Sequence, residues 1–401
     1  MTVATRPAVR KRPGTPRSVR RLRRLQRTAV ALLLAFGALV VTSLTVSFMA
    51  SSRAMESLAQ YQRLADARVQ AIDVQQAANS WALTPTDAVR TSVTDRLTTL
   101  ATTLADASAV DADRDRVVPL TGALVHYSMT LQDALNVRDQ ASAALLAQAD
   151  AQLSKELLGP LTDATTATAD RMSGELTTSW LGWSIGGFVL AAGGLAGILV
   201  ALARASHRYL NPGVALALLC ALASIGVLAA IAVAASNAAG GFTGGSRAEL
   251  DTVATVRQQV HQARADELLA VALRGSGGTY QQRWTTATTA AKNSLGSLSR
   301  PGSSAARLSS YSNAHDQLVA ATDKAQWDTA AGLATGASAK AFDTLDSTLG
   351  SVQANLRGPV TSSFQAVQDE IGLGIGGVIV LTVAGSGLAV WGVSRRIEEY
   401  R

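Results

Sequence analysis

Four uncharged apolar stretches alternate with two long polar segments along this chain. The stretches are residues 28–50, 180–203, 209–235 and 371–393, and none of them contains Asp, Glu, Lys or Arg. A helix rises about 1.5 Å per residue, so each stretch is long enough to cross a hydrocarbon core of about 30 Å. The pattern predicts a multi-pass membrane protein with four transmembrane helices.

Basic residues set the expected orientation of these helices. Residues 1–27 carry ten Arg or Lys and no acid, the turn at residues 204–208 carries two Arg, and the tail at residues 394–401 carries three. Because short cytoplasmic segments hold an excess of Lys and Arg, we expect the turn and both termini in the cytoplasm. Residues 51–179 and 236–370 then lie outside the cell membrane. The net charge of +7 comes from the cytoplasmic segments and does not indicate nucleic-acid binding.

Apolar residues recur at every third or fourth position in the first outer segment. This period predicts helices at about residues 57–83, 89–104 and 120–135, and a fourth helix that starts near residue 140 and runs toward the second apolar stretch. We expect Thr84 to cap the second helix and Pro85 to occupy its first turn.

The second outer segment has the same helical pattern with more glycine. Helices are predicted at about Ser246 to Arg274, Thr279 to Leu298, Ala305 to Gln326 and Ser338 to Glu370, with a short piece at Asp328 to Leu333. The glycine-rich residues 275–278 follow no strand and precede no Lys-Ser/Thr pair, so they predict a turn and not a phosphate loop. The expected fold class is an all-α membrane protein in which four transmembrane helices carry two tandem extracytoplasmic domains that resemble four-helix bundles.

Two short similarities indicate an internal duplication. Gly182, Ile185, Gly186 and Gly187 match Gly372, Ile375, Gly376 and Gly377 at a spacing of 190 residues. Leu158 to Thr162 resembles Arg357 to Thr361 at a spacing of 199 residues. The chain therefore reads as two copies of one unit, each made of a span, an outer helical domain and a second span.

Gly-Pro steps precede the second and fourth apolar stretches. They are Gly159-Pro160 and Gly358-Pro359, and each lies within a helix that otherwise continues into the membrane. Proline removes a backbone donor and crowds the preceding turn, so each step is expected to kink or break its helix. We interpret the four residues as candidate conformational hinges.

Glycines spaced four residues apart occur in the second and fourth apolar stretches. Such spacing allows two membrane helices to approach closely. The contact could form within one chain or along the seam of a homodimer, and the sequence leaves both open. The candidate helix-packing residues are Gly182, Gly186, Gly193, Gly197, Gly372 and Gly376.

Residue patterns typical of catalysis or metal binding are missing from the sequence. His126, His261 and His315 stand far apart, and the one cysteine, Cys220, lies inside an apolar stretch. No serine occurs in a Gly-x-Ser-x-Gly arrangement in a plausible catalytic context. We therefore expect no enzyme activity, no metal ion and no cofactor.

The cytoplasmic segments are too short to fold into a domain, so any signal that arrives there must be read by a separate protein. Their basic side chains could bind anionic membrane lipids, or they could dock an acidic protein. The candidate docking residues are Arg20, Arg21, Arg23, Arg24, Arg204, Arg208, Arg395, Arg396, Tyr400 and Arg401.

Two motifs resemble the GlnX-like family of actinobacterial membrane proteins. They are the segment Gln262 to Glu267, followed by Ala272 to Gly275, and the tail Arg395 to Arg401. The arrangement of four spans and two outer bundles is similar as well. The resemblance implies two partners, an extracytoplasmic lipoprotein that binds glutamine or glutamate and a cytoplasmic Ser/Thr kinase, protein kinase G.

Three functions fit these observations. The favoured hypothesis is a signal relay that passes the availability of an amino acid of the glutamate, glutamine and aspartate class from the lipoprotein to the kinase. A receptor that binds a small molecule directly between its outer helices is the second hypothesis, and a structural scaffold of the cell envelope is the third.

Overall fold

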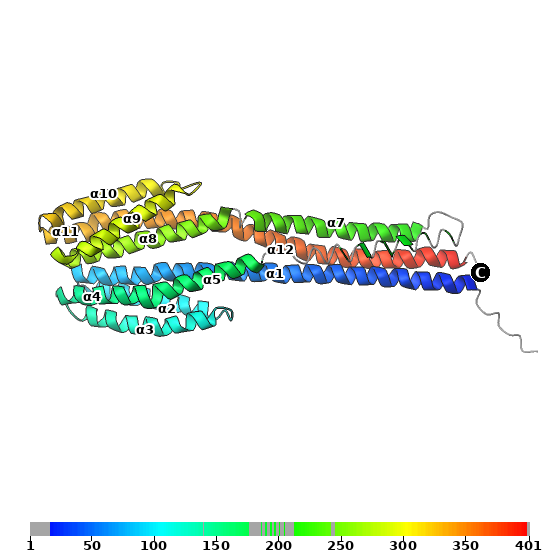
Figure 1. The fold of residues 1–401 in the computed structure, drawn as a ribbon, viewed down its shortest axis with the longest axis horizontal. Coiled ribbons are helices and arrows are strands. Elements are labelled where there is room, and N and C mark those ends of the chain that lie inside the picture. Colours follow the sequence, from blue (N-terminus) through cyan, green and yellow to red (C-terminus); the bar gives the residue numbers. More distant parts are fainter. Residues whose placement is uncertain are drawn as a thin grey trace, which may run out of the picture. The chain divides into compact units, whose positions relative to one another are not determined.

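The computed structural model describes residues 17–138, 140–175, 212–241 and 245–398, together with residues 186, 189–190, 193–194, 196–197, 200 and 204. Every regular element in this part of the chain is helical, and no strand occurs in it (Figure 1). The predicted all-α fold class is therefore confirmed for these residues.

Three helices within the described ranges are long and apolar enough to cross a membrane. They contain Leu22–Leu83, Pro212–Ala238 and Trp327–Arg395, which cover the first, third and fourth apolar stretches of the sequence. The protein is thus membrane-associated by the length and composition of its helices. Most of the second stretch, residues 180–203, lies outside the described residues, and its span stays a prediction.

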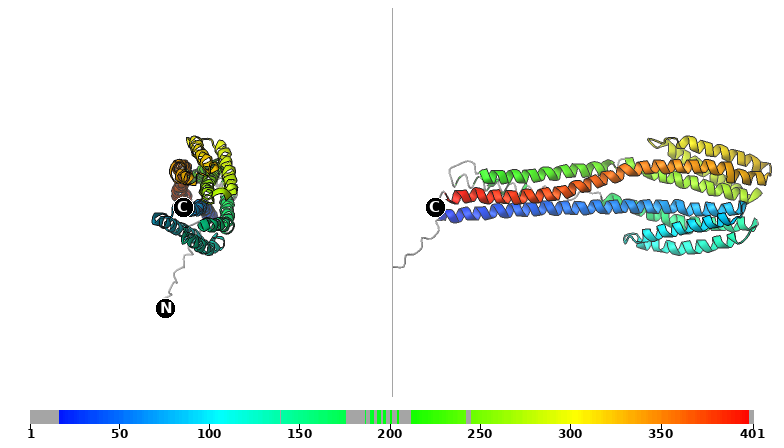
Figure 2. Two further views of the ribbon diagram at one scale, coloured as in Figure 1. Left: turned by 90° about the vertical axis from the view of Figure 1, so that its left-hand side faces the viewer. Right: turned by 180° about the vertical axis from the view of Figure 1, so that it is seen from behind.

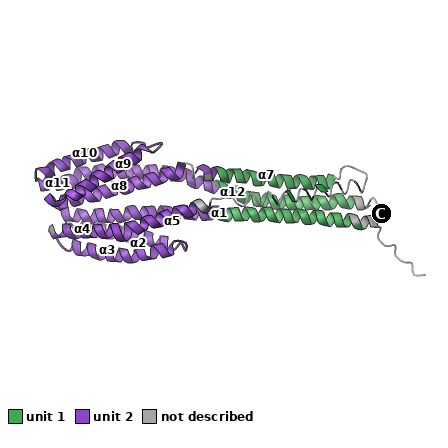
Figure 3. Cartoon of the chain, in the orientation of Figure 1, with its two compact units in different colours: residues 1–50, 178–236, 366–401 green, residues 51–177, 237–365 purple. Residues whose placement is uncertain are grey.

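Close helix packing characterises the first of two compact units, which comprises residues 1–50, 178–236 and 366–401 (Figure 3). Its described helices are parts of α1 (Arg17–Leu83), α7 (Pro212–Gly241) and α12 (Ala339–Glu398). A Cβ atom on Gly213 of α7 would lie 2.4 Å from the carbonyl oxygen of Leu388 in α12. At this glycine the two backbones approach too closely for any side chain.

The glycines expected to pack helices lie in more open surroundings. A Cβ atom would meet no other atom within 4 Å at any of the described candidates, and Gly182 lies outside the described residues. Contacts with a second copy of the chain therefore remain a prediction for these positions. The described candidates are Gly186, Gly193, Gly197, Gly372 and Gly376.

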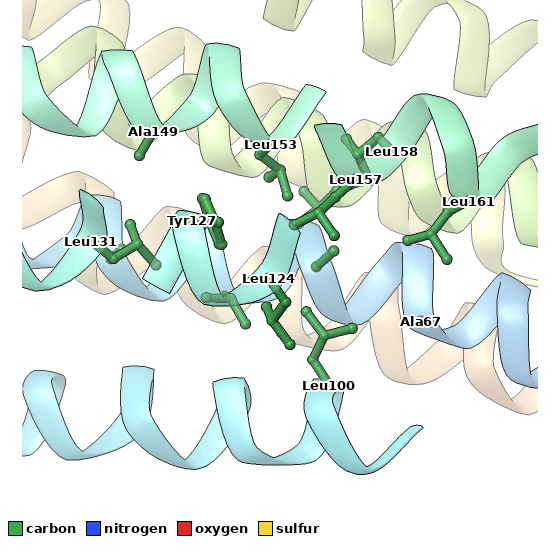
Figure 4. Close-up of a cluster of buried hydrophobic side chains, with 14 of the residues drawn as sticks. Ala67, Leu100, Leu124, Tyr127, Leu131, Ala149, Leu153, Leu157, Leu158 and Leu161 are labelled. Carbon is green, nitrogen blue, oxygen red and sulfur yellow. The ribbon is translucent and has the colours of Figure 1, made fainter. Parts of the chain in front are cut away.

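Bundle 1, the helical part of residues 51–177, begins with the second half of α1. The chain then forms α2 (Asp87–Ser108), α3 (Arg114–Leu135), α4 (Gln140–Gln152), a π-helical turn (Leu153–Leu158) and α5 (Gly159–Glu175). The buried side chains recur at three- and four-residue spacing on each helix, as the sequence predicts. Figure 4 shows part of this core, including Leu100, Leu124, Tyr127, Leu131, Leu153, Leu157 and Leu161.

The start of α2 differs from the prediction by two residues. Thr86, and not Thr84, is the N-cap, and its Oγ1 accepts a hydrogen bond from the backbone N–H of Val89 at 3.4 Å. Pro85 precedes the cap and so lies before the first turn of the helix. Thr84 is the first residue of the three-residue link between α1 and α2.

Bundle 2, the helical part of residues 237–365, follows the predicted helix pattern to within a few residues. It contains α8 (Arg247–Ala272), a 3-10 turn (Arg274–Ser276), α9 (Gly278–Gly296), α10 (Ser304–Asp323), α11 (Trp327–Leu333), a π-helical turn (Ala334–Ser338) and the first part of α12. The fourth helical segment of each bundle thus contains one π-helical turn. This correspondence agrees with the internal duplication.

The two bundles form one compact unit, which comprises residues 51–177 and 237–365. Ala265 and Leu269 of α8 are buried in the same hydrophobic cluster as the core of bundle 1. A smaller cluster joins Leu58 and Met172 of bundle 1 to Leu250 of α8 and Phe364 of α12. In Figure 2 the long ribbons of α1 and α12 are each continuous, and both helices belong to this unit as well as to the first.

The two Gly-Pro steps have different local structures. Gly159 directly follows the π-helical turn of bundle 1, and its N–H bonds to the carbonyl of Ser154, five residues earlier. Pro359 lies inside α12, which is not interrupted there. The α-helix is therefore not broken at Gly358-Pro359, and a kink there stays a prediction. A hinge role for either step stays a prediction.

Candidate functional site at the buried charged segment of α8

A run of charged residues in α8 is completely enclosed by the two bundles. Arg264 is 4% exposed, Asp266 is 1% exposed and Glu267 is 0% exposed. Buried charges are expensive unless each is paired and hydrogen-bonded, so the surrounding side chains must compensate for them.

Arg264 and Glu267 form an ion pair within bundle 2. The Nη1 atom of Arg264 lies 3.1 Å from Oε2 of Glu267, and its Nη2 atom donates to the carbonyl oxygen of Ala334 at 2.7 Å. The hydroxyl of Ser338 donates to Oε1 of Glu267. Since Ala334 and Ser338 are the first and last residues of the π-helical turn, the ion pair binds both ends of that turn. Turns of this kind are frequent at functional sites.

An aromatic group encloses the other side of Glu267. The hydroxyl of Tyr311 donates to Oε2 of Glu267 at 2.6 Å, and Nδ1 of His315 lies 3.5 Å from Oε1. The His315 ring stacks on Trp284 with a centroid distance of 3.5 Å. Burial acts to raise the pKa of Glu267, but Arg264, His315 and Ser338 outweigh it and lower this pKa to about 2. Glu267 is therefore a buried carboxylate at neutral pH.

Asp266 points the opposite way, toward bundle 1. Arg283 of α9 lies between two carboxylates, with Nη2 2.9 Å from Oδ1 of Asp266 and Nη1 2.7 Å from Oδ2 of Asp150 in α4. Burial raises the pKa of Asp266 to about 7, the charge of Asp150 adds to this effect, and Arg283 opposes it. One guanidinium thus serves two carboxylates, and Asp266 holds a proton in mildly acidic solution.

Hydrogen bonds continue from this segment into the core of bundle 1. The carbonyl oxygen of Ala265 accepts from Nδ2 of Asn79 in α1 at 2.9 Å. Gln75 donates to Oδ1 of Asn79 at 2.7 Å and accepts from the Tyr127 hydroxyl of α3 at 2.6 Å. Four buried polar groups therefore connect α8 to α3 through α1.

A second polar contact between the bundles surrounds His261, one turn before Arg264. Its Nε2 atom lies 3.0 Å from Oδ1 of Asp346 in α12, and its Nδ1 atom lies 3.9 Å from Oδ1 of Asp73 in α1. Arg257 lies 3.0 Å from Asp346 as well. Burial acts to raise the pKa of Asp346, but His261 and Arg257 hold it well below its usual range. Helices α1, α8 and α12 therefore meet at one charged cluster.

Sequence reasoning missed most of these partners. It treated the histidines as separate residues, but His261 and His315 each approach a carboxylate from another helix. It did not single out Asp113, which is buried and pairs with both Nη atoms of Arg171 at 2.8 and 2.7 Å. A signal was present at Asp150, which stands on the same helix face as the apolar Leu146 and Leu153.

The residues predicted to dock a cytoplasmic partner lie in the other unit. Arg20, Arg23 and Arg24 are in the first turns of α1, Arg395 lies over the Trp391 ring at 5.7 Å, and Arg204 is exposed. Arg21 and Arg396 are helical, but their side chains are not described, and Arg208, Tyr400 and Arg401 lie outside the described residues. Docking by these residues stays a prediction.

Metal-ligand clusters are not seen in the described part of the chain, where no three His, Cys, Asp or Glu side chains are grouped to hold an ion. The site is thus a network of ion pairs and hydrogen bonds between helices. The fold and the site define an all-helical, membrane-associated protein whose two bundles are joined through buried charges. Comparisons with protein-family profiles, with curated proteins and with solved structures find no match.

Proposed function

We propose that the protein relays a signal across the membrane, and that the buried charged segment of α8 couples the two bundles during the relay. The observation that carries the proposal is that neighbouring charges of α8 contact both bundles: the Arg264–Glu267 pair binds both ends of the π-helical turn before α12, and Asp266 is linked through Arg283 to Asp150 of bundle 1. Because both residues of the pair lie on α8, a shift of α8 must either move this turn or break their hydrogen bonds to Ala334 and Ser338.

The energetics of the pair favour discrete arrangements over gradual deformation. Losing a hydrogen bond to a buried charged group costs about 1.5–3 kcal/mol, so positions of α8 that leave Arg264 or Glu267 without its partner on the turn are disfavoured. Packed interfaces of this kind switch between alternative arrangements. Helices α1 and α12, at 67 and 60 residues, each belong to both units, and a stiff helix is a physical route for such a change.

The proposed input is an extracytoplasmic lipoprotein that binds an amino acid of the glutamate, glutamine and aspartate class. An exposed apolar stripe on α3 is suited to a protein partner. Val118, Val125 and Met129 are 49%, 61% and 60% exposed, and their spacing places them on one helix face. In the described parts of both bundles they are the most exposed large apolar side chains.

The proposed output is a cytoplasmic Ser/Thr kinase, of which the implied example is protein kinase G. The basic residues of the tail, with Arg395 and Arg396 as the preferred contacts, would hold an acidic surface through weak, salt-sensitive pairs. The support for this step is the sequence, in which the tail carries three Arg within residues 395–401.

Crosslinking in native membranes tests both ends of the relay. A photoreactive residue at Val125 should capture an amino-acid-binding lipoprotein, identified by mass spectrometry, and one at Arg395 should capture a Ser/Thr kinase. Val125→Asp should reduce lipoprotein capture by a reporter at Met129, whereas Thr98→Asp at an exposed position of α2, outside the stripe, serves as the control. If neither class of partner is captured in membranes that contain the correctly inserted protein, the relay is wrong in its partners.

A further inference from the structure

A cavity of about 200 Å³ opens at the end of bundle 2, where the turn between α8 and α9 meets the corner between α10 and α11. Its walls include the apolar side chains Val271 and Leu318 and the ring of Trp327. Arg274 and Asp323 supply opposite charges to the same cavity. The space is smaller than the roughly 300–1,000 Å³ of sites for drug-sized ligands, so it suits a small molecule.

The backbone at the rim adopts an unfavourable conformation. Arg274 has a φ of 45° and Ala325 has a φ of 53°, and these are the non-glycine residues with positive φ in the described part of the chain. Each follows the C-cap of its helix, α8 or α10, at the position where glycine is usual. A left-handed arginine costs free energy that glycine would avoid. Strain of this kind clusters at functional sites.

Three glycines lie close to Arg274, and packing accounts for only one of them. A Cβ atom on Gly277 would lie 2.3 Å from the carbonyl oxygen of Ala270, so close packing requires glycine at this position. Gly275 and Gly278 also line the cavity, but a Cβ atom on either would meet nothing within 4 Å. Neither packing nor a positive φ explains these two glycines, whereas an occupant close to the backbone would.

The charges at the cavity indicate the chemistry of that occupant. No ion pair joins Arg274 or Asp323 to a described residue, and both side chains are exposed to solvent. The 19-residue helix α9 begins at Gly278 without a side-chain cap, and its free N–H groups add to the positive potential near Arg274. Arg274 can bind a carboxylate in a bidentate manner, while Asp323 can accept from an ammonium group.

We propose that this cavity binds a small zwitterion of the free amino-acid class, with its carboxylate at Arg274, its ammonium group at Asp323 and its side chain against Trp327. The occupant would also be connected to the buried charged segment through hydrogen-bonded side chains. Gln281 lines the cavity and lies 2.9 Å from Nε2 of His315, whose other nitrogen faces Glu267. The binding inference stands apart from the proposed relay, because it is measured without any partner protein.

The test uses the full chain in lipid nanodiscs and the shift of its unfolding temperature on addition of free L-amino acids. At least one amino acid should raise the unfolding temperature, whereas its decarboxylated and deaminated analogues, which lack one of the two charges, should not. Absence of a shift with every L-amino acid would overturn the proposal. Asp323→Asn should weaken binding of the active amino acid.

Substitution of the strained residues gives a sharper test, because glycine removes the strain in either case. Arg274→Gly should leave the unfolding temperature of the free protein unchanged or higher, yet weaken binding by about tenfold or more through loss of a charged hydrogen-bond partner. Ala325→Gly is the matched control: it relieves the same strain and should retain the wild-type affinity. If Arg274→Gly binds as tightly as the wild type, the site is not this cavity.

Discussion

Tyr61 of α1 donates a hydrogen bond to Asp251 of α8, and the two residues are separated by 190 positions in the chain. Arg68, seven residues further along α1, donates to Gln258, which lies seven residues further along α8. The same 190-residue spacing separates Gly182 from Gly372 in the sequence. Helices α1 and α8 therefore run in the same direction and in register, so that equivalent positions of the two repeats face each other.

The first prediction concerns the Tyr61–Asp251 contact. Burial, followed by the charge of Asp251, raises the pKa of Tyr61 well above its usual value, so the phenol stays protonated and remains a donor. A hydrogen bond to a carboxylate contributes about 1.5–3 kcal/mol, part of which is offset by solvent at this half-buried site. Tyr61→Phe and Asp251→Asn should therefore show a coupling of about 1 kcal/mol in a double-mutant cycle of unfolding in detergent. Strict additivity would show that the contact does not hold α1 and α8 together.

The second prediction is a pH dependence from Asp266. Its pKa in the folded protein is raised from 3.8 to about 7, so the folded state binds the proton more tightly than the unfolded state. This contribution to stability is complete below pH 4 and is lost as the pH rises through 7, with an upper bound of about 4 kcal/mol at 1.36 kcal/mol per pKa unit. Asp266→Asn should abolish the decline between pH 5 and pH 8, as measured by unfolding temperature. An unchanged decline in this variant would assign it to another group.

At lower pH the opposite effect comes from Glu267. Its pKa is lowered from 4.5 to about 2, so its contribution to stability is present above pH 4.5 and is lost as the pH falls toward 2. Glu267→Gln should therefore flatten the acid limb of the stability profile and leave the limb between pH 5 and pH 8 intact. The Asp266→Asn variant is the reciprocal control, because it should keep the acid limb.

The third prediction distinguishes the contribution of charge at the Arg264–Glu267 pair from the contribution of side-chain packing. Arg264→Met alone leaves Glu267 buried without its cation and should destabilise the protein by about 3–5 kcal/mol. Arg264→Met/Glu267→Gln removes both charges and keeps an amide oxygen that accepts from either Tyr311 or Ser338, so we expect it to cost less than Arg264→Met alone. Chemical unfolding in detergent would compare the two. Equal losses would mean that shape, and not charge, makes the segment stable.

The sequence predicted the helices of both bundles well because their apolar residues recur with the helical period. It divided α1 into a span at residues 28–50 and an outer helix at residues 57–83, whereas the structure has one helix, Arg17–Leu83. No residue between these two segments breaks a helix. The change from apolar to polar residues reflects a change of the expected surroundings, from membrane to water, and does not mark the end of a helix. Without glycine or proline there, the backbone hydrogen bonds continue.

The candidate site was much harder to predict. Its charged residues belong to α8, α9, α4 and α12, and their pairing depends on how the bundles pack, which periodicity does not encode. The π-helical turns at Leu153–Leu158 and Ala334–Ser338 likewise have no composition of their own. Only the adjacent Arg264, Asp266 and Glu267, on a helix that is apolar on several faces, could have indicated a buried cluster.

The fourth prediction tests the orientation in the membrane. The sequence has one cysteine, Cys220, so a Cys220→Ala background allows single cysteines to be read out. Cysteines at Ser108 and Ser303 should react with an impermeant maleimide in intact cells, and a cysteine at Thr5 should react only after the membrane is opened, because the basic N-terminal segment is costly to translocate. Labelling of Thr5→Cys alone in intact cells would reverse the topology.

The central claim is that the buried charges of α8 couple the two bundles in a transmembrane relay, and the variant Asp150→Asn/Arg283→Met, which removes the ion pair between the bundles, tests it most directly. The measurement is kinase-dependent phosphorylation in cells after addition of external glutamate, glutamine or aspartate, at equal membrane levels of variant and wild-type protein. Loss of the response, or its fixation in one state, in a variant that still folds and inserts is the predicted result. A wild-type response would contradict the account.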